Sequence, residues 1–140
     1  MGSAKTHPHI ERPSEEQLRV AVENRNPVIR ELYLAMHQLV LETVPDVIYS
    51  VDCHDGEIGY GARQYGYNGW GMAAVVPYTN WVSLAFLAGA QLDDPAGILE
   101  GTSSTIRHVK VRSWEQFTDL RVSLQGLVGA AARLNRGTSA

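Results

Sequence analysis

The sequence predicts an α+β domain: a two-layer sandwich in which an antiparallel sheet of about five or six strands carries helices from both ends of the chain on one face. Two observations favour this class. Apolar residues recur at three- and four-residue steps near both termini, whereas residues 47–111 hold short, β-branched or alternating segments. The predicted strands and helices do not alternate along the chain, so nothing indicates a parallel Rossmann-type sheet.

Length and charge limit the organisation and the partners. A chain of 140 residues with 44% hydrophobic content is the size of one domain. We expect that domain to span residues 14–136, between a flexible lead-in over 1–13 and a flexible tail over 137–140. A net charge of -3 argues against nucleic-acid and membrane partners. No apolar run approaches the roughly 20 residues of a membrane helix, and the polar start does not resemble a signal peptide, so we expect a cytoplasmic protein.

Capping signals predict where the helices begin. The first is expected to run to about Asn24, the second to end before Pro45, and the third to continue to the end of the domain. A hydroxyl or amide residue precedes each apolar stripe at the N-cap position. The three signals are Ser14 with Gln17, Asn26 followed by Pro27, and Ser113 with Gln116.

The segments between the second and third helices are predicted to be strands. Asp55-Gly56 and Asn68-Gly69 are typical of tight hairpin turns, because both pairs readily adopt positive φ angles. In the last strand, Val109 and Val111 alternate with polar residues and are expected to face the core. The predicted strands cover residues 47–51, 58–60, the two sides of Asn68-Gly69, 72–78, 82–88 and 106–111.

Three stretches, in this order and spacing, resemble the YdhG-like family of small bacterial proteins of unknown function: "IGYGARQYGYNGWGMAAV", "WVSLAFLAGAQLDDPAGILEGT" and "RHVKVRS". The resemblance covers about residues 28–134. It implies a fold similar to that of frataxin. Some members are described as iron chaperones, by analogy with frataxins, so the resemblance also implies weak iron binding and an iron-acceptor protein as partner. Ser103-Ser104 stand here where relatives usually carry a Gly-Lys pair.

The first candidate site is the acidic segment Asp93-Asp94-Pro95, with Glu100 nearby. These three carboxylates offer hard oxygen ligands, but a specific metal site needs several converging oxygens. Aspartate before proline, followed by Gly97, is typical of a chain reversal. We therefore interpret this segment as a turn.

The second candidate site is the hairpin "DCHDGE". We expect Asp52, Asp55 and Glu57 to offer reversible capture of iron(II), because hard carboxylates at an exposed edge suit a weak carrier. The set does not match structural zinc, which takes four ligands, mostly Cys and His. A solvated Asp-Gly hairpin without any metal explains the same residues. Cys53 is the only cysteine, which excludes an intramolecular disulfide.

The third candidate is a small-molecule or protein-partner site on the glycine- and aromatic-rich sheet face. Glycines allow close approach of a ligand, aromatic rings form flat walls, and arginine holds carboxylates or phosphates. A twisted sheet with large cross-strand neighbours explains the same residues. The ligand-binding candidates are Tyr60, Arg63, Tyr65, Trp70, Arg107 and His108, beside Trp81, Lys110 and Arg112.

Catalysis is the weakest hypothesis. Ser103 or Ser104 with His108 and Asp119 could form a nucleophile, base and acid, but no nucleophile-elbow motif surrounds the serines. His37 lies among apolar neighbours and is expected to be a hydrogen-bonded core residue. The sequence therefore predicts a non-catalytic binding protein without a tightly bound cofactor. Its state, monomer or homodimer, is left open.

Overall fold

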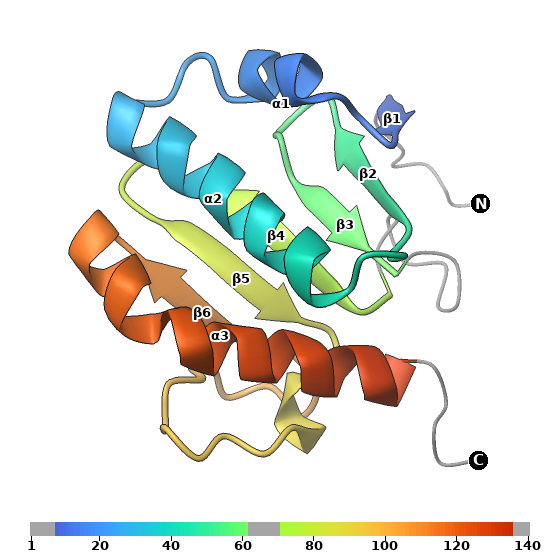
Figure 1. Cartoon of the computed structure of the whole chain (residues 1–140), viewed down its shortest axis with the longest axis vertical. Helices are drawn as coiled ribbons and strands as arrows, with labels where there is room; N and C mark the ends of the chain where they lie inside the picture. Colours follow the sequence, from blue (N-terminus) through green and yellow to red (C-terminus); the bar gives the residue numbers. More distant parts are fainter. Residues whose placement is uncertain (1–7, 62–70, 136–140) are drawn as a thin grey trace.

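The computed structural model describes residues 8–61 and 71–135 (Figure 1). Six strands form one antiparallel sheet in which each strand pairs with its neighbours in the sequence, in the order β1 to β6. The strands are β1 (His9–Glu11), β2 (Tyr49–Asp52), β3 (Ile58–Tyr60), β4 (Ala73–Pro77), β5 (Val82–Phe86) and β6 (Arg107–Val111). The helices are α1 (Glu15–Ala21), α2 (Pro27–Thr43) and α3 (Trp114–Asn135), with a 3-10 turn at Gly89–Gln91. The α+β class is thus confirmed, whereas a frataxin-like arrangement stays a prediction.

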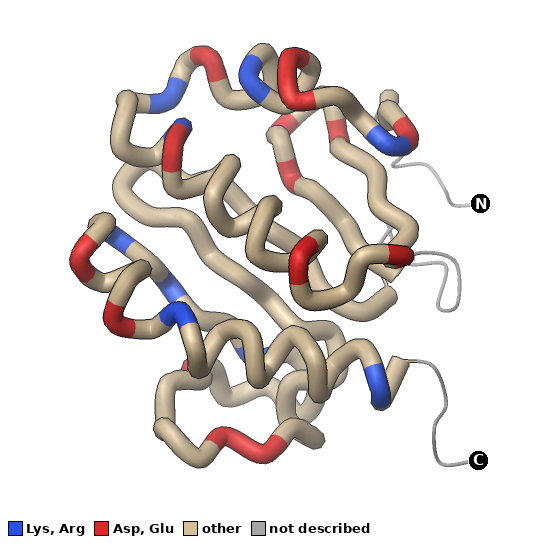
Figure 2. Tube along the Cα trace, viewed as in Figure 1, with Lys and Arg blue, Asp and Glu red and all other residues tan. Residues whose placement is uncertain are grey.

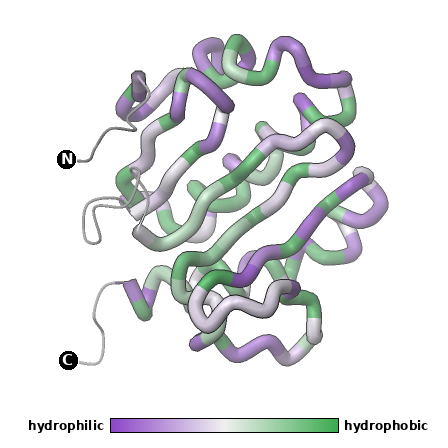
Figure 3. The backbone as a smooth tube through the Cα atoms, turned by 180° about the vertical axis from the view of Figure 1, so that it is seen from behind, coloured by the Kyte–Doolittle hydropathy of each residue, from purple (hydrophilic) through white to green (hydrophobic). Residues whose placement is uncertain are grey.

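The molecule has two layers. Helices α2 and α3 lie side by side across one face of the sheet, as Figure 1 shows. In the view from behind, no helix of residues 8–61 and 71–135 covers the opposite face (Figure 3), which we call the outer face. The register of the strands separates the two faces: Val75, Leu84 and Val109 stand opposite one another and are buried under the helices. Their neighbours along each strand therefore point to the outer face.

All three predicted helix starts are confirmed. The Ser14 hydroxyl accepts from the Gln17 N–H at 3.1 Å, and the Gln17 side chain accepts from the Ser14 N–H at 2.9 Å. Asn26 accepts from the Ile29 N–H at 2.9 Å. At α3 the Ser113 hydroxyl accepts from the Gln116 N–H at 3.1 Å. Each cap satisfies amides that the first helical turn leaves without partners.

The core lies between the helices and the sheet. Val109 and Val111 are 2% and 0% exposed, which confirms the predicted core side of β6. Apolar residues at helical spacing meet them from α2 and α3, which explains why those helices carry a single apolar stripe. The largest fully buried side chains include Tyr33, Tyr60, Phe86, Ile29, Leu32, Met36, Leu84 and Leu124. Within residues 8–61 and 71–135, no helix is both long and apolar enough to cross a membrane.

One expectation for the N-terminal segment was wrong. Residues 9–11, which belong to the predicted loose lead-in, form the edge strand β1 and pair with β2. The strand forms because Ile10 stands opposite Val51 and packs against the core, while Pro8 accepts a hydrogen bond from the Cys53 N–H at 2.8 Å. The domain therefore begins before residue 14.

The acidic segment after β5 is a turn, as interpreted from the sequence. The two carboxylate oxygens of Asp94 accept from the N–H groups of Ile98 and Leu99, at 3.0 and 2.9 Å. Gly97 has a φ of +66°, a conformation that favours glycine. Asp94 thus organises the reversal of the chain, and both of its oxygens serve the backbone.

Candidate functional site

The acidic hairpin between β2 and β3 has the geometry expected of an Asp-Gly turn. The Asp52 N–H donates to the Glu57 carbonyl at 2.9 Å, and the Gly56 N–H donates to the Asp52 carbonyl at 2.8 Å. Gly56 adopts a φ of +80°, and a side chain there would press against the Ala21 carbonyl of α1. The turn is therefore fixed in shape and closely packed beneath.

Two of the three candidate metal ligands also stabilise the turn. Asp52 accepts from the His54 N–H at 2.7 Å, and Asp55 accepts from the Glu57 N–H at 3.0 Å, each through Oδ1. These side-chain bonds to a backbone amide two residues ahead are typical of aspartate in turns. Each carboxylate has a second oxygen, Oδ2, that does not take part in these bonds.

Residue His9 extends the acidic hairpin onto the neighbouring strand. His9 stands opposite Asp52 in the β1–β2 pairing, and its Nε2 lies 3.8 Å from the Asp52 Oδ2. Ser50 lies within hydrogen-bonding reach of the other ring nitrogen, at 3.5 Å. The sequence analysis missed His9 because it treated this segment as a loose lead-in. The alternation of His9, Ile10 and Glu11 is the signal that indicates a strand.

The electrostatics of the hairpin centre on Glu57. Burial, and to a lesser extent the nearby charges of Asp55 and then Asp52, raise the pKa of the Glu57 carboxyl to about 7. The three carboxylates therefore repel one another, and Glu57 gains a proton readily near neutral pH. A cation at this hairpin would relieve that repulsion.

The hairpin does not form a closed metal site. In the part of the chain that the structure describes, no group of three or more His, Cys, Asp or Glu side chains is arranged to hold a metal ion. Cys53 is exposed, between Asp52 and His54 in the sequence. The arrangement provides a concentration of negative charge at a sheet corner, without fixed coordination.

Tyr60, a predicted ligand-binding residue, lies in the core. Its ring is 0% exposed, and its hydroxyl lies 2.8 Å from Nδ1 of the buried His37 on α2. Burial raises the pKa of Tyr60 well above its ordinary value and lowers the pKa of His37 to about 4. The pair is a hydrogen-bonded core contact, as expected for His37, and Tyr60 is not accessible to a ligand.

The other residues of the aromatic candidate do not gather in one place. Arg63, Tyr65 and Trp70 lie outside the described residues. Arg107 and His108 are consecutive on β6 and therefore point to opposite faces. Arg107 donates to the carbonyls of Ser103 and Ile106, whereas the His108 Nε2 lies 3.8 Å from the Glu100 Oε1. Arg107 thus closes a loop, and only His108 faces outward.

A cationic and aromatic cluster occupies the outer face beside β6. The Lys110 Nζ lies 4.8 Å from the centre of the Trp81 ring, and the Arg112 guanidinium carbon lies 5.4 Å from it. The Tyr78 ring centre is 5.1 Å away, and the Trp81 Nε1 donates to the Ser83 hydroxyl at 3.1 Å. We call Tyr78, Trp81, Lys110 and Arg112 the Trp81 cluster. The sequence analysis placed Trp81, Lys110 and Arg112 in the third candidate site and missed only Tyr78.

The residues of the catalytic hypothesis serve other purposes. The Ser103 hydroxyl accepts from the N–H groups of Thr105 and Ile106, at 3.0 and 3.1 Å, and so shapes its own loop. Asp119 is exposed on α3, on the helix side of the sheet, whereas His108 points to the outer face. The structure does not bring these groups together as nucleophile, base and acid.

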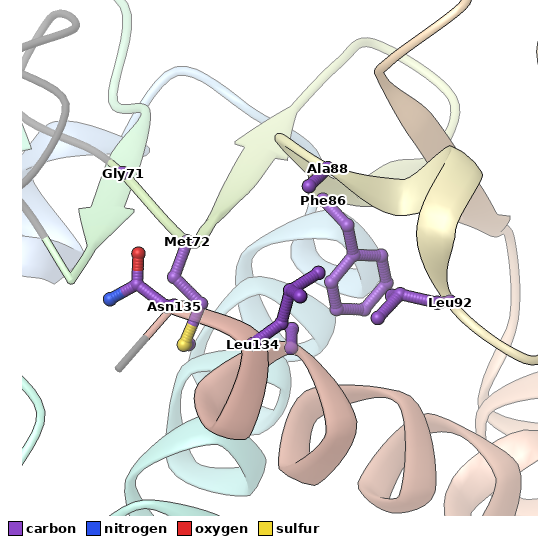
Figure 4. Close-up of a pocket in the computed structure, with 8 residues that line it drawn as sticks. Gly71, Met72, Phe86, Ala88, Leu92, Leu134 and Asn135 are labelled. Atoms are coloured by element: carbon purple, nitrogen blue, oxygen red, sulfur yellow. The ribbon is translucent and has the colours of Figure 1, made fainter. Parts of the chain in front are cut away.

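A small pocket lies at the C-terminal part of α3 (Figure 4). Its volume of about 10 Å³ is close to the space of one water molecule. Met72, Phe86 and Leu134 line it, and the neighbouring Asn135 has a buried Oδ1 without a hydrogen-bond partner in the structure. This pocket is too small for an organic ligand.

Comparison with known proteins gives no further assignment. No family model, no curated protein and no solved structure matches this chain.

Proposed function

We propose that this chain is a non-catalytic binding protein that captures a divalent cation, foremost iron(II), weakly and reversibly at the acidic hairpin. The observation that carries the proposal is the position of these residues on adjacent strands. The Asp52 carboxylate lies beside His9 on β1, and the Asp52 backbone N–H donates to the carbonyl of Glu57, just before β3. Oxygen and imidazole ligands of this kind suit iron(II).

Two further features support a weak carrier. Asp55 accepts its turn hydrogen bond through one of its two carboxylate oxygens, Oδ1. The raised pKa of Glu57 reflects burial first and then the negative charges of Asp55 and Asp52, whose repulsion a bound cation would relieve. The resemblance to the YdhG-like family favours iron over other divalent ions.

An anaerobic iron(II) titration followed by amide NMR tests the proposal. We expect selective paramagnetic broadening of the amides from His9 to Glu11 and from Asp52 to Glu57 at micromolar iron. Replacing Asp52 and Asp55 by Asn and Glu57 by Gln should abolish it, while the Asn side chains can still accept the turn hydrogen bonds. The matched control is Asp93→Asn, which removes an exposed carboxylate elsewhere. Unselective broadening, or none up to millimolar iron, would exclude the carrier function.

A second candidate function is the binding of a small anionic ligand at the Trp81 cluster. Two cations approach one indole ring, and neither Lys110 nor Arg112 forms an ion pair with another described residue. A planar carboxylate can stack on the ring and bind the guanidinium at the same time. This second candidate retains Trp81, Lys110 and Arg112 from the third site predicted from the sequence and adds Tyr78.

Benzoate is a suitable probe for this second function. A titration followed by amide NMR should shift the signals of Trp81 and Lys110 and leave those of the acidic hairpin unchanged. Lys110→Gln and Arg112→Gln should each weaken the binding, whereas Arg121→Gln, which removes an exposed arginine on α3, should not. Equal weakening by all three variants would indicate unspecific attraction and would exclude this site.

A further inference from the structure

A groove of about 610 Å³ runs between α3 and the segment that links β5 to β6. Figure 1 shows this segment passing along the side of α3 that faces away from α2. Leu92, Leu127 and Ala130 contribute apolar surface to the groove, while Asp93 and Arg133 contribute opposite charges. Figure 2 shows acidic positions on the linking segment beside the groove. The groove is therefore apolar in part, with charged borders of both signs.

Contacts within one copy of the chain do not explain two residues of α3 beside this groove, an exposed valine and a glycine in the middle of the helix. Val122 is 78% exposed, the highest value among the large apolar residues of the described part. Gly126 lies mid-helix, where glycine is less favourable to the helix than alanine. A Cβ atom at Gly126 would meet no other heavy atom within 4 Å, so no contact inside the chain requires a glycine there. Both residues suit the close approach of another helix.

Two exposed, oppositely charged residues of α3 lie at equal distances along the sequence from Gly126. Asp119 lies seven residues before it and Arg133 seven residues after it, and both are exposed. Neither residue forms an ion pair with another residue in the part of the chain that the structure describes. Val122 and Ala130 lie four residues to either side of the same point. The exposed stripe is thus self-complementary when the helix is reversed.

We propose that two copies of the chain associate through α3, with the helices antiparallel and a two-fold axis at Gly126. Asp119 of each copy then lies opposite Arg133 of the second copy, which forms two ion pairs by symmetry. Val122 of each copy packs on Ala130 of the second copy, and the missing side chains at Gly126 let the helices approach closely. Such an interface is isologous, because the same surface is used on both sides.

The β5–β6 segment completes the interface. Pro95 and Ala96 border the groove, so they form a wall against which the helix of the second copy rests. The helix has 22 residues and is about 33 Å long, which gives room for the whole stripe from Asp119 to Arg133. A basic peptide would satisfy Asp93 and Asp119 but would leave Arg133 unpaired. A second copy satisfies both signs of charge.

Sedimentation equilibrium of the full chain over a wide concentration range tests the proposal. We expect a monomer–dimer equilibrium that Val122→Ser weakens, while Val20→Ser, which changes an exposed valine on α1, leaves it unchanged. Asp119→Arg and Arg133→Asp should each weaken association about tenfold or more, because each reversal sets like charges opposite one another at two places. The double variant should recover the affinity of the original chain.

Gly126→Ala separates folding from association. The substitution should raise the thermal stability of the monomer by favouring the helix, and at the same time weaken the dimer by separating the two helices. Circular dichroism of every variant checks that it folds. A chain that stays monomeric at about 1 mM, where even weak pairs associate, would overturn the proposal. A dimer that responds to none of these variants, or a double reversal that fails to recover, would also overturn it.

Discussion

The Tyr33 hydroxyl donates to the backbone carbonyl of Gly56 at 2.7 Å, which ties the acidic hairpin to the middle of α2. Both groups are buried, and burial raises the pKa of Tyr33 above its ordinary value, so the phenol stays protonated and remains a donor. The shape of the candidate site is thus set by a core residue 23 positions earlier in the sequence.

Tyr33→Phe is expected to destabilise the fold by about 1 to 3 kcal/mol, because it leaves the buried Gly56 carbonyl without a donor. Urea unfolding at pH 7 measures the change. The amide shifts of residues 52–57 should move as well, since the turn loses its anchor. Tyr78→Phe, at an exposed tyrosine, provides the control. Equal effects of the two substitutions would show that the hydrogen bond contributes nothing specific.

Acid should destabilise the protein through His37. Its pKa is about 4 in the folded chain against an ordinary value of 6.5, because burial disfavours the imidazolium. Between these values the unfolded chain binds more protons, so the free energy of unfolding falls as the pH drops from about 6.5 to about 4. The full loss is on the order of 3 kcal/mol. In urea unfolding at a series of pH values, His37→Gln should flatten this slope, and an unchanged slope would refute the assignment.

Glu57 should make the protein less stable as the pH rises, which is the opposite of the pH dependence expected from His37. Its folded-state pKa of about 7 exceeds the ordinary 4.5, so the folded chain binds more protons between these values and loses stability as the pH rises through them. Glu57→Gln is therefore expected to stabilise the protein at pH 8 by about 1 to 2 kcal/mol, since partial exposure weakens the effect, and to change little at pH 4. Glu115→Gln serves as the exposed control. Destabilisation by Glu57→Gln at pH 8 would contradict the prediction.

Substitution of the adjacent residues Asp93 and Asp94 should change the free energy of unfolding by very different amounts. Asp94→Ala removes both acceptors of the Ile98 and Leu99 amides and should cost about 1 to 3 kcal/mol. Asp93→Ala should change stability by less than about 0.5 kcal/mol, as is usual at exposed positions. Thermal unfolding of the two variants is a direct comparison. Similar losses would show that the turn does not depend on the Asp94 carboxylate.

Gly89→Ala should be among the most damaging small substitutions. A Cβ atom there would lie 2.5 Å from the Arg107 Cβ and 2.8 Å from its backbone nitrogen, so β6 or the 3-10 turn must shift. We expect a loss of roughly 2 to 4 kcal/mol in the free energy of unfolding. Thermal unfolding measures it, and a variant as stable as the original chain would show that the two segments can separate at little cost.

The sequence was most informative where structure is determined locally. Ser14, Asn26 and Ser113 cap their helices through residues three positions ahead, so the capping pattern alone located the helix starts. The Asp55-Gly56 turn and the core side of Val109 follow from equally local rules. The Asp94 turn belongs to the same group, because its carboxylate binds amides within five residues.

Features that depend on distant partners could not be predicted in the same way. The strand β1 exists because Ile10 meets Val51, some forty residues later. The sequence analysis assigned Tyr60 to a ligand-binding face. The alternation of residues along a strand shows that successive side chains point to opposite faces of the sheet, but it does not show which face the helices cover. Its contact with His37 on α2 shows that the Tyr60 side chain lies on the face that the helices cover. His9 could not be predicted as part of the candidate site for the same reason, because only the pairing of β1 with β2 brings it beside Asp52.

The consecutive order of the strands bears on how the chain acquires its structure. Each of the five strand pairings joins strands that are consecutive in the chain. The pairing of β2 with β3 and of β4 with β5 needs only short loop closures, which favour fast folding, whereas β1 must pair with β2 across α1 and α2. Helix α3 is translated last among the described elements, yet its buried residues Leu124, Leu127 and Val128 cover the strands already formed. Until this helix has left the ribosome, the nascent sheet exposes apolar surface that chaperones recognise. Deletion of α3 should therefore yield an aggregating chain.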